Sequence, residues 1–205
     1  MVPLDEPEGK ESRDTAYRRR ILSAARSLLE QNGIDSVNMY QIAQEAGIGQ
    51  GTLYRRFEHP GEIYSELIRT SAEQFLDDME AQSVQADPSS SALDRLYDFI
   101  DRLVDYLDGN AELLTAISCM YAGKKSFLPH KRPISIRIRS LVEGCLRLAL
   151  ERGEIEEIDV TLTTSFLLSA LAPEQYLYHR ETYGYGKEQY VAGVRRLFIE
   201  AIRHK

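Results

Sequence analysis

The stretch of sequence that decides the fold is residues 38–57, which read NMYQIAQEAGIGQGTLYRRF. Its apolar and small residues recur at helical spacing on both sides of Gly47-Ile48-Gly49, which predicts two short helices joined by a three-residue turn. Asn38 is suited to cap the first helix, over 39–46, and the second helix is expected over 50–57. Two helices joined in this way are typical of a helix-turn-helix, whose second helix enters the major groove of DNA.

The same pattern predicts which side of each helix is buried. Apolar side chains at these spacings face the core, and they are Ile42, Ala43, Ala46, Ile48, Leu53 and Phe57. The polar residues of the second helix are then left on its outer faces, where their chemistry suits DNA. Gln and Arg pair with base edges, a Thr methyl can contact the methyl of thymine, and Tyr and Arg hold phosphates. The candidate DNA contacts from this pattern are Gln50, Thr52, Tyr54, Arg55 and Arg56.

Helical patterns continue on both sides of this stretch. Upstream, apolar spacings of three and four predict a helix over 14–32, which Gly33 ends because a positive φ is needed there. Downstream, His59-Pro60 starts a long helix to about residue 82, and Pro173 is expected to kink a later helix. Since no strand alternation is found, the chain is predicted to be all-α with about nine helices. Those beyond residue 82 are expected over 92–108, 110–122, 134–152, 160–180 and 187–204.

Charge is unevenly distributed among the three parts that we expect along the chain. Residues 1–13 are expected to form an acidic, disordered tail, followed by a helix-turn-helix domain over 14–58 and a larger helical domain over 59–205. The formal net charge of the whole chain is −7, yet residues 10–57 carry eight Lys and Arg against five Asp and Glu. The pattern indicates a small basic module on an acidic body, which is compatible with nucleic-acid binding.

Composition excludes several classes of protein. The chain has 205 residues, 43% of them hydrophobic, which is enough for one large or two small globular domains. Two cysteines do not support a disulfide-stapled fold or a Cys-rich zinc site. No apolar run reaches the roughly 18 residues that a membrane span needs, and the acidic N-terminus is unlike a signal peptide. We therefore expect no membrane association and a cytoplasmic location.

The sequence offers no pattern for catalysis. The four histidines are scattered, and no metal-ligand spacing or nucleophile motif accompanies them. We therefore predict no enzymatic activity, no metal and no cofactor.

Residues 20–63 resemble the N-terminal domain of the tetracycline-repressor (TetR/AcrR) family of transcriptional regulators. The resemblance rests on Ile21-Leu22, Ala24-Ala25, Gly33, Ile42-Ala43, Ala46-Gly47-Ile48, Gly51-Thr52-Leu53-Tyr54 and Phe57. It implies a ligand-responsive homodimeric regulator, a repressor released from a palindromic double-stranded DNA operator by a small molecule. It also implies that the larger helical domain binds this effector and dimerises through its last two helices.

The resemblance also implies roles for individual residues at the DNA. Asn38 would cap its helix next to a phosphate, and Tyr40 would contact a base or the backbone. Gln50 and Thr52 would reach bases, Tyr54 and Arg56 would hold phosphates, and Arg55 could do either. The family usually places a phosphate-binding Lys where this chain has His59-Pro60, so that contact is expected to be lost or to pass to His59 or a neighbouring backbone N–H.

Candidate residues in the larger domain follow from its aromatic and apolar patterns. Aromatic, apolar and polar side chains of the larger domain are expected to line an effector cavity, and they are Tyr97, Met120, Tyr121, Phe127, Phe166 and Ser169. Apolar stripes at three and four spacing near the C-terminus are expected to form the dimer interface, through Leu167, Leu168, Leu171, Val194, Leu197 and Phe198.

Three other interpretations remain open at this point. Residues 38–57 could belong to a helical bundle or adaptor that docks protein instead of DNA, or the helical body could be a small-molecule-modifying enzyme. Arg18, Arg19 and Arg20 could form a solvated face or include a phosphate contact. Salt dependence separates a DNA-binding module from an adaptor, because DNA binding weakens steeply as salt rises.

Overall fold

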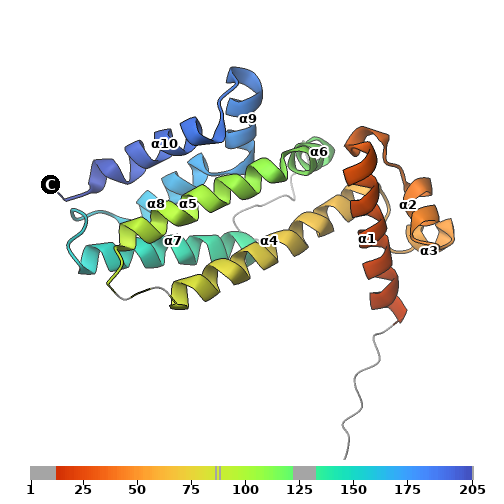
Figure 1. Cartoon of the computed structure of the whole chain (residues 1–205), viewed down its shortest axis with the longest axis horizontal. Coiled ribbons are helices and arrows are strands. Elements are labelled where there is room, and N and C mark those ends of the chain that lie inside the picture. The colour runs from red at the N-terminus through yellow and green to blue at the C-terminus, as the bar shows by residue number, and fades with distance from the viewer. Residues whose placement is uncertain (1–12, 86, 88, 122–132, 205) are drawn as a thin grey trace, which may run out of the picture. The chain divides into compact units, whose positions relative to one another are not determined.

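The computed structural model describes residues 13–85, 87, 89–121 and 133–204. Over these residues the chain forms ten α-helices and two short 3-10 helices, η1 and η3 (Figure 1). The described residues contain no strand, and their one β-type pairing is an isolated bridge between Ile155 and Arg203. The predicted all-α class is therefore confirmed. The expected tail over 1–13 lies outside the described residues except for Arg13, which begins α1.

The chain divides into two compact units, one up to Leu67 and one from Ile68. The boundary falls inside one long helix, nine residues beyond the expected boundary after residue 58. The elements of the N-terminal unit are α1 (Arg13–Asn32), η1 (Ile34–Ser36), α2 (Met39–Glu45), α3 (Gln50–Tyr54) and the first part of α4 (Pro60–Gln85).

Two glycines end helices of the N-terminal unit as predicted. Gly33 follows α1 with φ 73°, and Gly47 follows α2 with φ 61°. This left-handed backbone conformation costs a residue with a Cβ roughly 1–2 kcal/mol, whereas glycine adopts it freely. The two glycines therefore fix where α1 and α2 stop, and with that the length of the turn before α3.

The C-terminal unit contains the rest of α4 and all later helices. Its elements are α5 (Ala92–Gly109), α6 (Ala111–Tyr121), α7 (Pro133–Glu151), α8 (Val160–Ala170), α9 (Pro173–Tyr183), α10 (Lys187–Phe198) and η3 (Glu200–Ile202). None of the helices in the described residues combines the length and apolar character that crossing a membrane requires.

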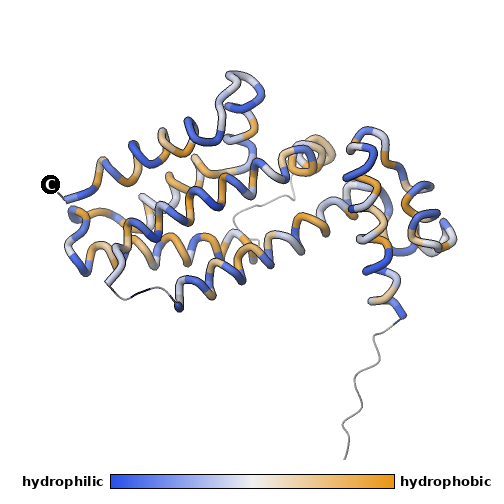
Figure 2. The backbone as a smooth tube through the Cα atoms, in the orientation of Figure 1, coloured by the Kyte–Doolittle hydropathy of each residue, from blue (hydrophilic) through white to orange (hydrophobic). Residues whose placement is uncertain are grey.

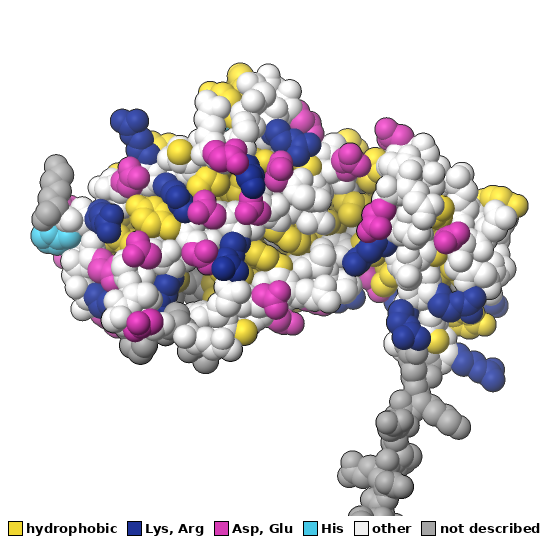
Figure 3. Space-filling model, viewed as in Figure 1, with side chains coloured by type: hydrophobic (Ala, Val, Ile, Leu, Met, Phe, Trp, Pro, Cys, Tyr) yellow, Lys and Arg dark blue, Asp and Glu magenta, His cyan; other side chains and the backbone are white. Residues whose placement is uncertain are grey.

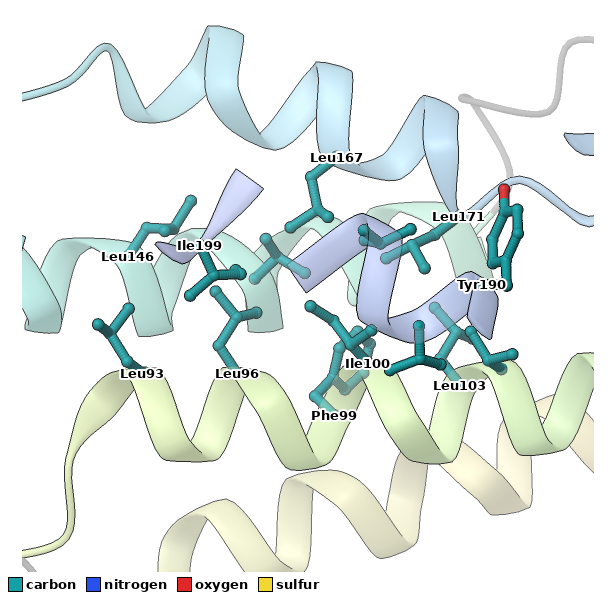
Figure 4. Close-up of a cluster of buried hydrophobic side chains, with 14 of the residues drawn as sticks. Leu93, Leu96, Phe99, Ile100, Leu103, Leu146, Leu167, Leu171, Tyr190 and Ile199 are labelled. Carbon is teal, nitrogen blue, oxygen red and sulfur yellow. The ribbon is translucent and has the colours of Figure 1, made fainter. Parts of the chain in front are cut away.

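Helix α5 lies at the centre of the core of the C-terminal unit. Its apolar residues follow the helical period (Figure 2), so that one face is buried and the other carries charge. The buried face packs on α7 and α10. Figure 4 shows Leu96, Ile100 and Leu103 of α5 pointing toward Leu167 and Leu171 at the end of α8. Burial of these side chains is the main source of stability for the unit.

A carboxylate from the α7–α8 loop caps the start of α5. The backbone N–H groups of Ala92 and Leu93 donate to Glu154 over 3.0 and 3.1 Å, and the Ser91 hydroxyl donates to it over 2.7 Å. The backbone N–H of His204 donates to the carbonyl oxygen of Glu154 over 3.0 Å. This loop therefore links the N-terminus of α5 to the last residues of the chain.

The prediction of a single helix over 160–180 is wrong. The segment forms two helices, α8 and α9, and Pro173 is the first residue of α9. Proline is favoured there because the first turn of a helix needs no N–H donor, so the chain turns at Leu171-Ala172 instead of kinking. This break also accounts for a tenth helix where about nine were expected.

Candidate nucleic-acid interface

The helix-turn-helix forms where the sequence predicts it, although α3 ends at Tyr54 and does not extend to residue 57 as expected. Asn38 caps α2: its side chain accepts a hydrogen bond from the backbone N–H of Gln41 (3.1 Å), and the Gln41 side chain accepts one from the Asn38 N–H (2.9 Å). Gly49 occupies the corresponding position before α3 and supplies no side-chain cap. The residues predicted to face inward are buried, namely Ile42, Ala43, Ala46, Leu53 and Phe57, while Ile48 in the turn is half-buried.

Five of the predicted contact residues lie on the outside of this unit, and the N-cap residue Asn38 is one of them. Tyr40 at the start of α2 is 60% exposed and Tyr54 at the end of α3 is 50% exposed. Gln50 and Arg55 are also exposed, and Arg55 donates to the half-buried Thr52 hydroxyl over 3.2 Å. Figure 3 shows Lys and Arg side chains gathered over the N-terminal end of α1 and beside α3. The two helices thus present hydrogen-bonding and cationic groups outward, as DNA recognition requires.

Arg20 of α1 is exposed, and its side chain supports the turn of the motif. One of its guanidinium nitrogens, Nη2, donates to the carbonyl oxygens of Ala46 (2.6 Å) and Gly47 (2.9 Å). These carbonyls belong to the C-terminal end of α2, where a cation is favoured by the helix dipole and by orphan acceptors. The sequence shows a basic triplet here, but only the fold shows that Arg20 stabilises the turn between α2 and α3.

Arg18 is also engaged inside the unit. It pairs with the Glu66 carboxylate of α4, and its guanidinium lies over the Phe57 ring with 4.9 Å to the centroid. The hydrogen bond to Glu66 raises the pKa of Arg18. Two residues of the basic triplet therefore hold α1 against α2 and α4, which favours a structural role for both.

Arg56, expected to hold a phosphate, already has partners. Its Nη2 lies 2.7 Å from Asp14 of α1, and its Nη1 donates to the Thr52 carbonyl oxygen over 2.9 Å. The guanidinium stacks over the Tyr17 ring, 4.8 Å from the centroid. Its side chain is only 16% exposed. The sequence did not indicate Asp14 or Tyr17, because their contact with Arg56 joins residues about 40 positions apart.

The Arg56 contacts border a hollow in the surface. Its volume is about 300 Å³, and its lining residues are Asp14, Tyr17, Thr52, Arg55 and Arg56. The lining therefore contains two arginines, one threonine and one carboxylate, and the carboxylate of Asp14 pairs with Arg56. The hollow joins three of the predicted DNA contacts into one site.

The effector candidates that the structure describes lie in different surroundings. Tyr97 lies under the Arg195 guanidinium, 4.7 Å from its ring centroid, while Phe166 is 57% and Met120 38% exposed. Ser169 is exposed and donates to the Ser165 carbonyl oxygen of its own helix. Phe127 and the side chain of Tyr121 lie outside the described residues. The effector cavity therefore stays a prediction.

The predicted dimer residues fall into two groups. Leu167, Leu171 and Val194 are buried in the core of their own chain (Figure 4 labels the first two), so they do not present their side chains at a surface. Leu168 and Phe198 are half-buried, and Leu197 is 70% exposed. The stripes read from the sequence mixed core with surface positions, because both recur every three or four residues on a helix.

A family model and curated relatives match the N-terminal part of the chain. Residues 21–64 match the bacterial regulatory proteins of the tetR family. An HTH-type transcriptional regulator of Staphylococcus aureus strain USA300 is 36% identical over 59 residues, which cover 29% of this chain and 32% of that protein. The match to the relative thus spans about a third of that protein, and the family-model match runs from within α1 to the first turn of α4.

Solved structures share the fold over most of the chain. The transcriptional regulator FadR from Bacillus subtilis, in complex with stearoyl-CoA, has a TM-score of 0.63 at 22% identity, covering 90% of this chain and 99% of that one. Thermus thermophilus FadR, a TetR-family repressor in complex with lauroyl-CoA, has a TM-score of 0.65 at 15% identity, covering 92% and 96%. Both helical units therefore have counterparts in regulators of known structure.

Proposed function

We propose that this chain, whose residues 21–64 match the bacterial regulatory proteins of the tetR family, is a DNA-binding homodimeric repressor released from a palindromic operator by a small molecule. The observation that carries the proposal is the outer surface of α2 and α3. Every apolar residue expected inside is at least half-buried, and Tyr40, Gln50, Tyr54 and Arg55 are left exposed. Gln and Arg supply bidentate contacts to base edges, and the tyrosines supply hydroxyls for the backbone.

A two-fold operator calls for a two-fold protein, and the C-terminal unit offers a surface for it. Helices α8 and α10 pack together, and each leaves apolar side chains exposed. Phe166 and Leu162 are one turn apart on α8, 57% and 50% exposed, and Leu197 lies near the end of α10. We place the dimer interface on these residues, so that Phe166 belongs to the interface and not to the effector site.

Effector response requires two states of the dimer with different spacings of the recognition helices. Successive major grooves on one side of DNA lie about 34–36 Å apart, so only one of these spacings fits an operator. Helix α4 runs without a break from the N-terminal into the C-terminal unit. It is therefore the element through which we propose that effector binding reaches α3.

The function is tested by selecting duplexes that the full-length protein retains from a random pool. We expect enrichment of a palindrome whose half-site centres are one helical turn apart. Acyl-CoA thioesters, such as those held by the FadR structures, form the first effector panel, and release from the selected duplex is the readout. Recovery of no common sequence would contradict an operator-binding function.

A further inference from the structure

The guanidinium of Arg56 is incompletely satisfied in the free protein. Of its N–H groups, Nη1 donates to the Thr52 carbonyl oxygen and Nη2 faces Asp14. Its Nε is buried and has no hydrogen-bond partner in the described residues. Buried donors without a partner are rare in proteins, so this N–H is available to a bound acceptor.

The unpaired donor lies on the edge of the guanidinium that binds oxyanions. Nε and Nη2 point the same way, and a carboxylate or phosphate with two oxygens can accept from both at once. One oxygen of Asp14 meets Nη2 at 2.7 Å, while Nε stays unpaired. Asp14 therefore fills half of a bidentate site.

The surroundings of this edge suit an anion that comes from outside. The hollow of about 300 Å³ is open at the surface and also lined by Thr52 and Arg55, which is exposed. The Asp14 side chain is 64% exposed. The exposed Asp14 carboxylate regains water when it leaves, and an incoming oxyanion takes over the charge of Arg56, so a second oxyanion can replace Asp14 at small cost.

We propose that this hollow is the seat of one backbone phosphate of duplex DNA, and that Asp14 occupies Arg56 until the phosphate displaces it. Arg56 then donates through Nε and Nη2 to the phosphate, while Tyr17 keeps the guanidinium plane in place by stacking. The displaced carboxylate stays close to the DNA and repels it. Asp14 thereby limits affinity for DNA of arbitrary sequence. The inference rests on the proposed function, and it adds a residue that limits non-specific DNA binding.

The test compares binding of full-length variants to a duplex of arbitrary sequence over a series of KCl concentrations. Asp14→Asn removes the carboxylate, and Asp35→Asn is the matched control because Asp35 is an exposed aspartate of the same unit. We expect Asp14→Asn to bind about threefold or more tightly than the control, and the slope of log affinity against log salt to steepen by about 0.9 for each subunit that contacts the duplex. Asp14→Glu keeps the charge and is expected to bind like the wild type.

Asp14→Asn and Asp35→Asn are also made in an Arg56→Gln background, which completes a double-mutant cycle. There the advantage of Asp14→Asn over Asp35→Asn is expected to vanish, because no guanidinium remains to be released. Persistence of that advantage would overturn the proposal, as would Asp14→Asn binding no better than the control or more weakly. Circular dichroism shows that each variant is folded. Wild-type protein that binds no duplex at the lowest salt would refute the function itself, whereas wild-type binding with equal Asp14→Asn and Asp35→Asn affinities refutes only the role of Asp14.

Discussion

Single residues of the helix-turn-helix divide into those that make the fold and those that face outward. Tyr54 belongs to the second group, because it is half exposed at the end of α3. Within the described residues, its hydroxyl makes no hydrogen bond to another side chain. Tyr54→Ala is expected to weaken binding of a selected duplex about tenfold, since one lost phosphate hydrogen bond is worth about 0.5–1.5 kcal/mol. Fluorescence anisotropy measures this change.

The control for Tyr54 is Tyr178→Ala in the C-terminal unit, because Tyr178 is also 50% exposed. It is expected to leave DNA affinity unchanged. Equal losses of affinity in the two variants would count against Tyr54 as a DNA contact, since they would reflect a general effect of removing a surface tyrosine.

A glycine pair tests how the motif is built. Gly47 has φ 61°, and a Cβ on it would lie 2.9 Å from the Arg20 guanidinium. Gly51 in α3 has ordinary helical backbone and open space around it. Gly47→Ala is expected to lower the free energy of unfolding by about 1–2 kcal/mol, whereas Gly51→Ala should raise it by up to about 1 kcal/mol. Urea unfolding followed by circular dichroism distinguishes the two, and equal stabilities would contradict this role for Gly47.

At this scale the sequence predicts buried and capping residues better than it predicts charged pairs. Gly47, Leu53 and Asn38 are determined by local spacing, so the sequence identifies them. The partners of Arg18, Arg20 and Arg56 are not, because each guanidinium reaches a group 26 to 48 positions away. Long side chains on one helix can face several neighbours, and only tertiary packing decides among them.

At the scale of elements, helix ends determine how the chain is divided. The helix bounds of the N-terminal unit were predictable within a few residues, because glycine and asparagine terminate or cap helices there. Pro173 was misread as a kink, since proline fits equally well at the first position of a new helix. Spacing alone does not separate these two uses of proline.

The cap of α5 by Glu154 gives a pH-dependent prediction. Burial of the carboxylate acts to raise its pKa, but hydrogen bonds from Ala92, Ser91 and Leu93 outweigh it and lower the pKa. A lowered folded-state pKa means that the carboxylate stabilises the fold above its unfolded pKa of about 4.3. That contribution is lost as pH falls through the folded value. Glu154→Gln is expected to destabilise by about 1–3 kcal/mol at neutral pH, with the difference from wild type shrinking below about pH 4.

Exposed Glu157 in the same loop provides the matched substitution for Glu154. Glu157→Gln is expected to leave the pH profile of the free energy of unfolding close to that of the wild type. Thermal or urea unfolding at a series of pH values measures both profiles. A Glu154→Gln profile that runs parallel to the wild-type profile down to acid pH would show that the cap does not depend on the carboxylate charge.

At the scale of the whole molecule, the distribution of charge matters more than its total. The chain is acidic overall, while the block over 10–57 has more basic than acidic residues. The acidic part of the chain repels DNA, whereas the basic block over 10–57 attracts it. Binding is therefore directed to this block, which contains α2 and α3. The exchange at Asp14 applies the same principle at a single arginine.

The proposed dimer is tested through the exposed apolar residues of α8 and α10. Leu197→Glu and Phe166→Glu are expected to convert the dimer to monomer and to weaken operator binding, because a charge is costly to bury in an apolar interface. Ile136→Glu on α7 is the control, since Ile136 is 53% exposed. Light scattering after size exclusion gives the molar mass. Unchanged dimers in both interface variants would place the contact elsewhere.

The central claim is that α2 and α3 bind duplex DNA through their outer polar residues. Its most direct test is the affinity of wild type, Arg55→Ala and Gln50→Ala for the selected duplex and for a scrambled one, measured across salt concentration. We predict a steep salt dependence for the wild type and a reduced preference for the selected sequence in Gln50→Ala. For Arg55→Ala we predict a slope smaller by about 1.8, because each of the two subunits loses one phosphate contact worth about 0.9. Affinity that is independent of salt and identical in the three proteins would contradict the claim.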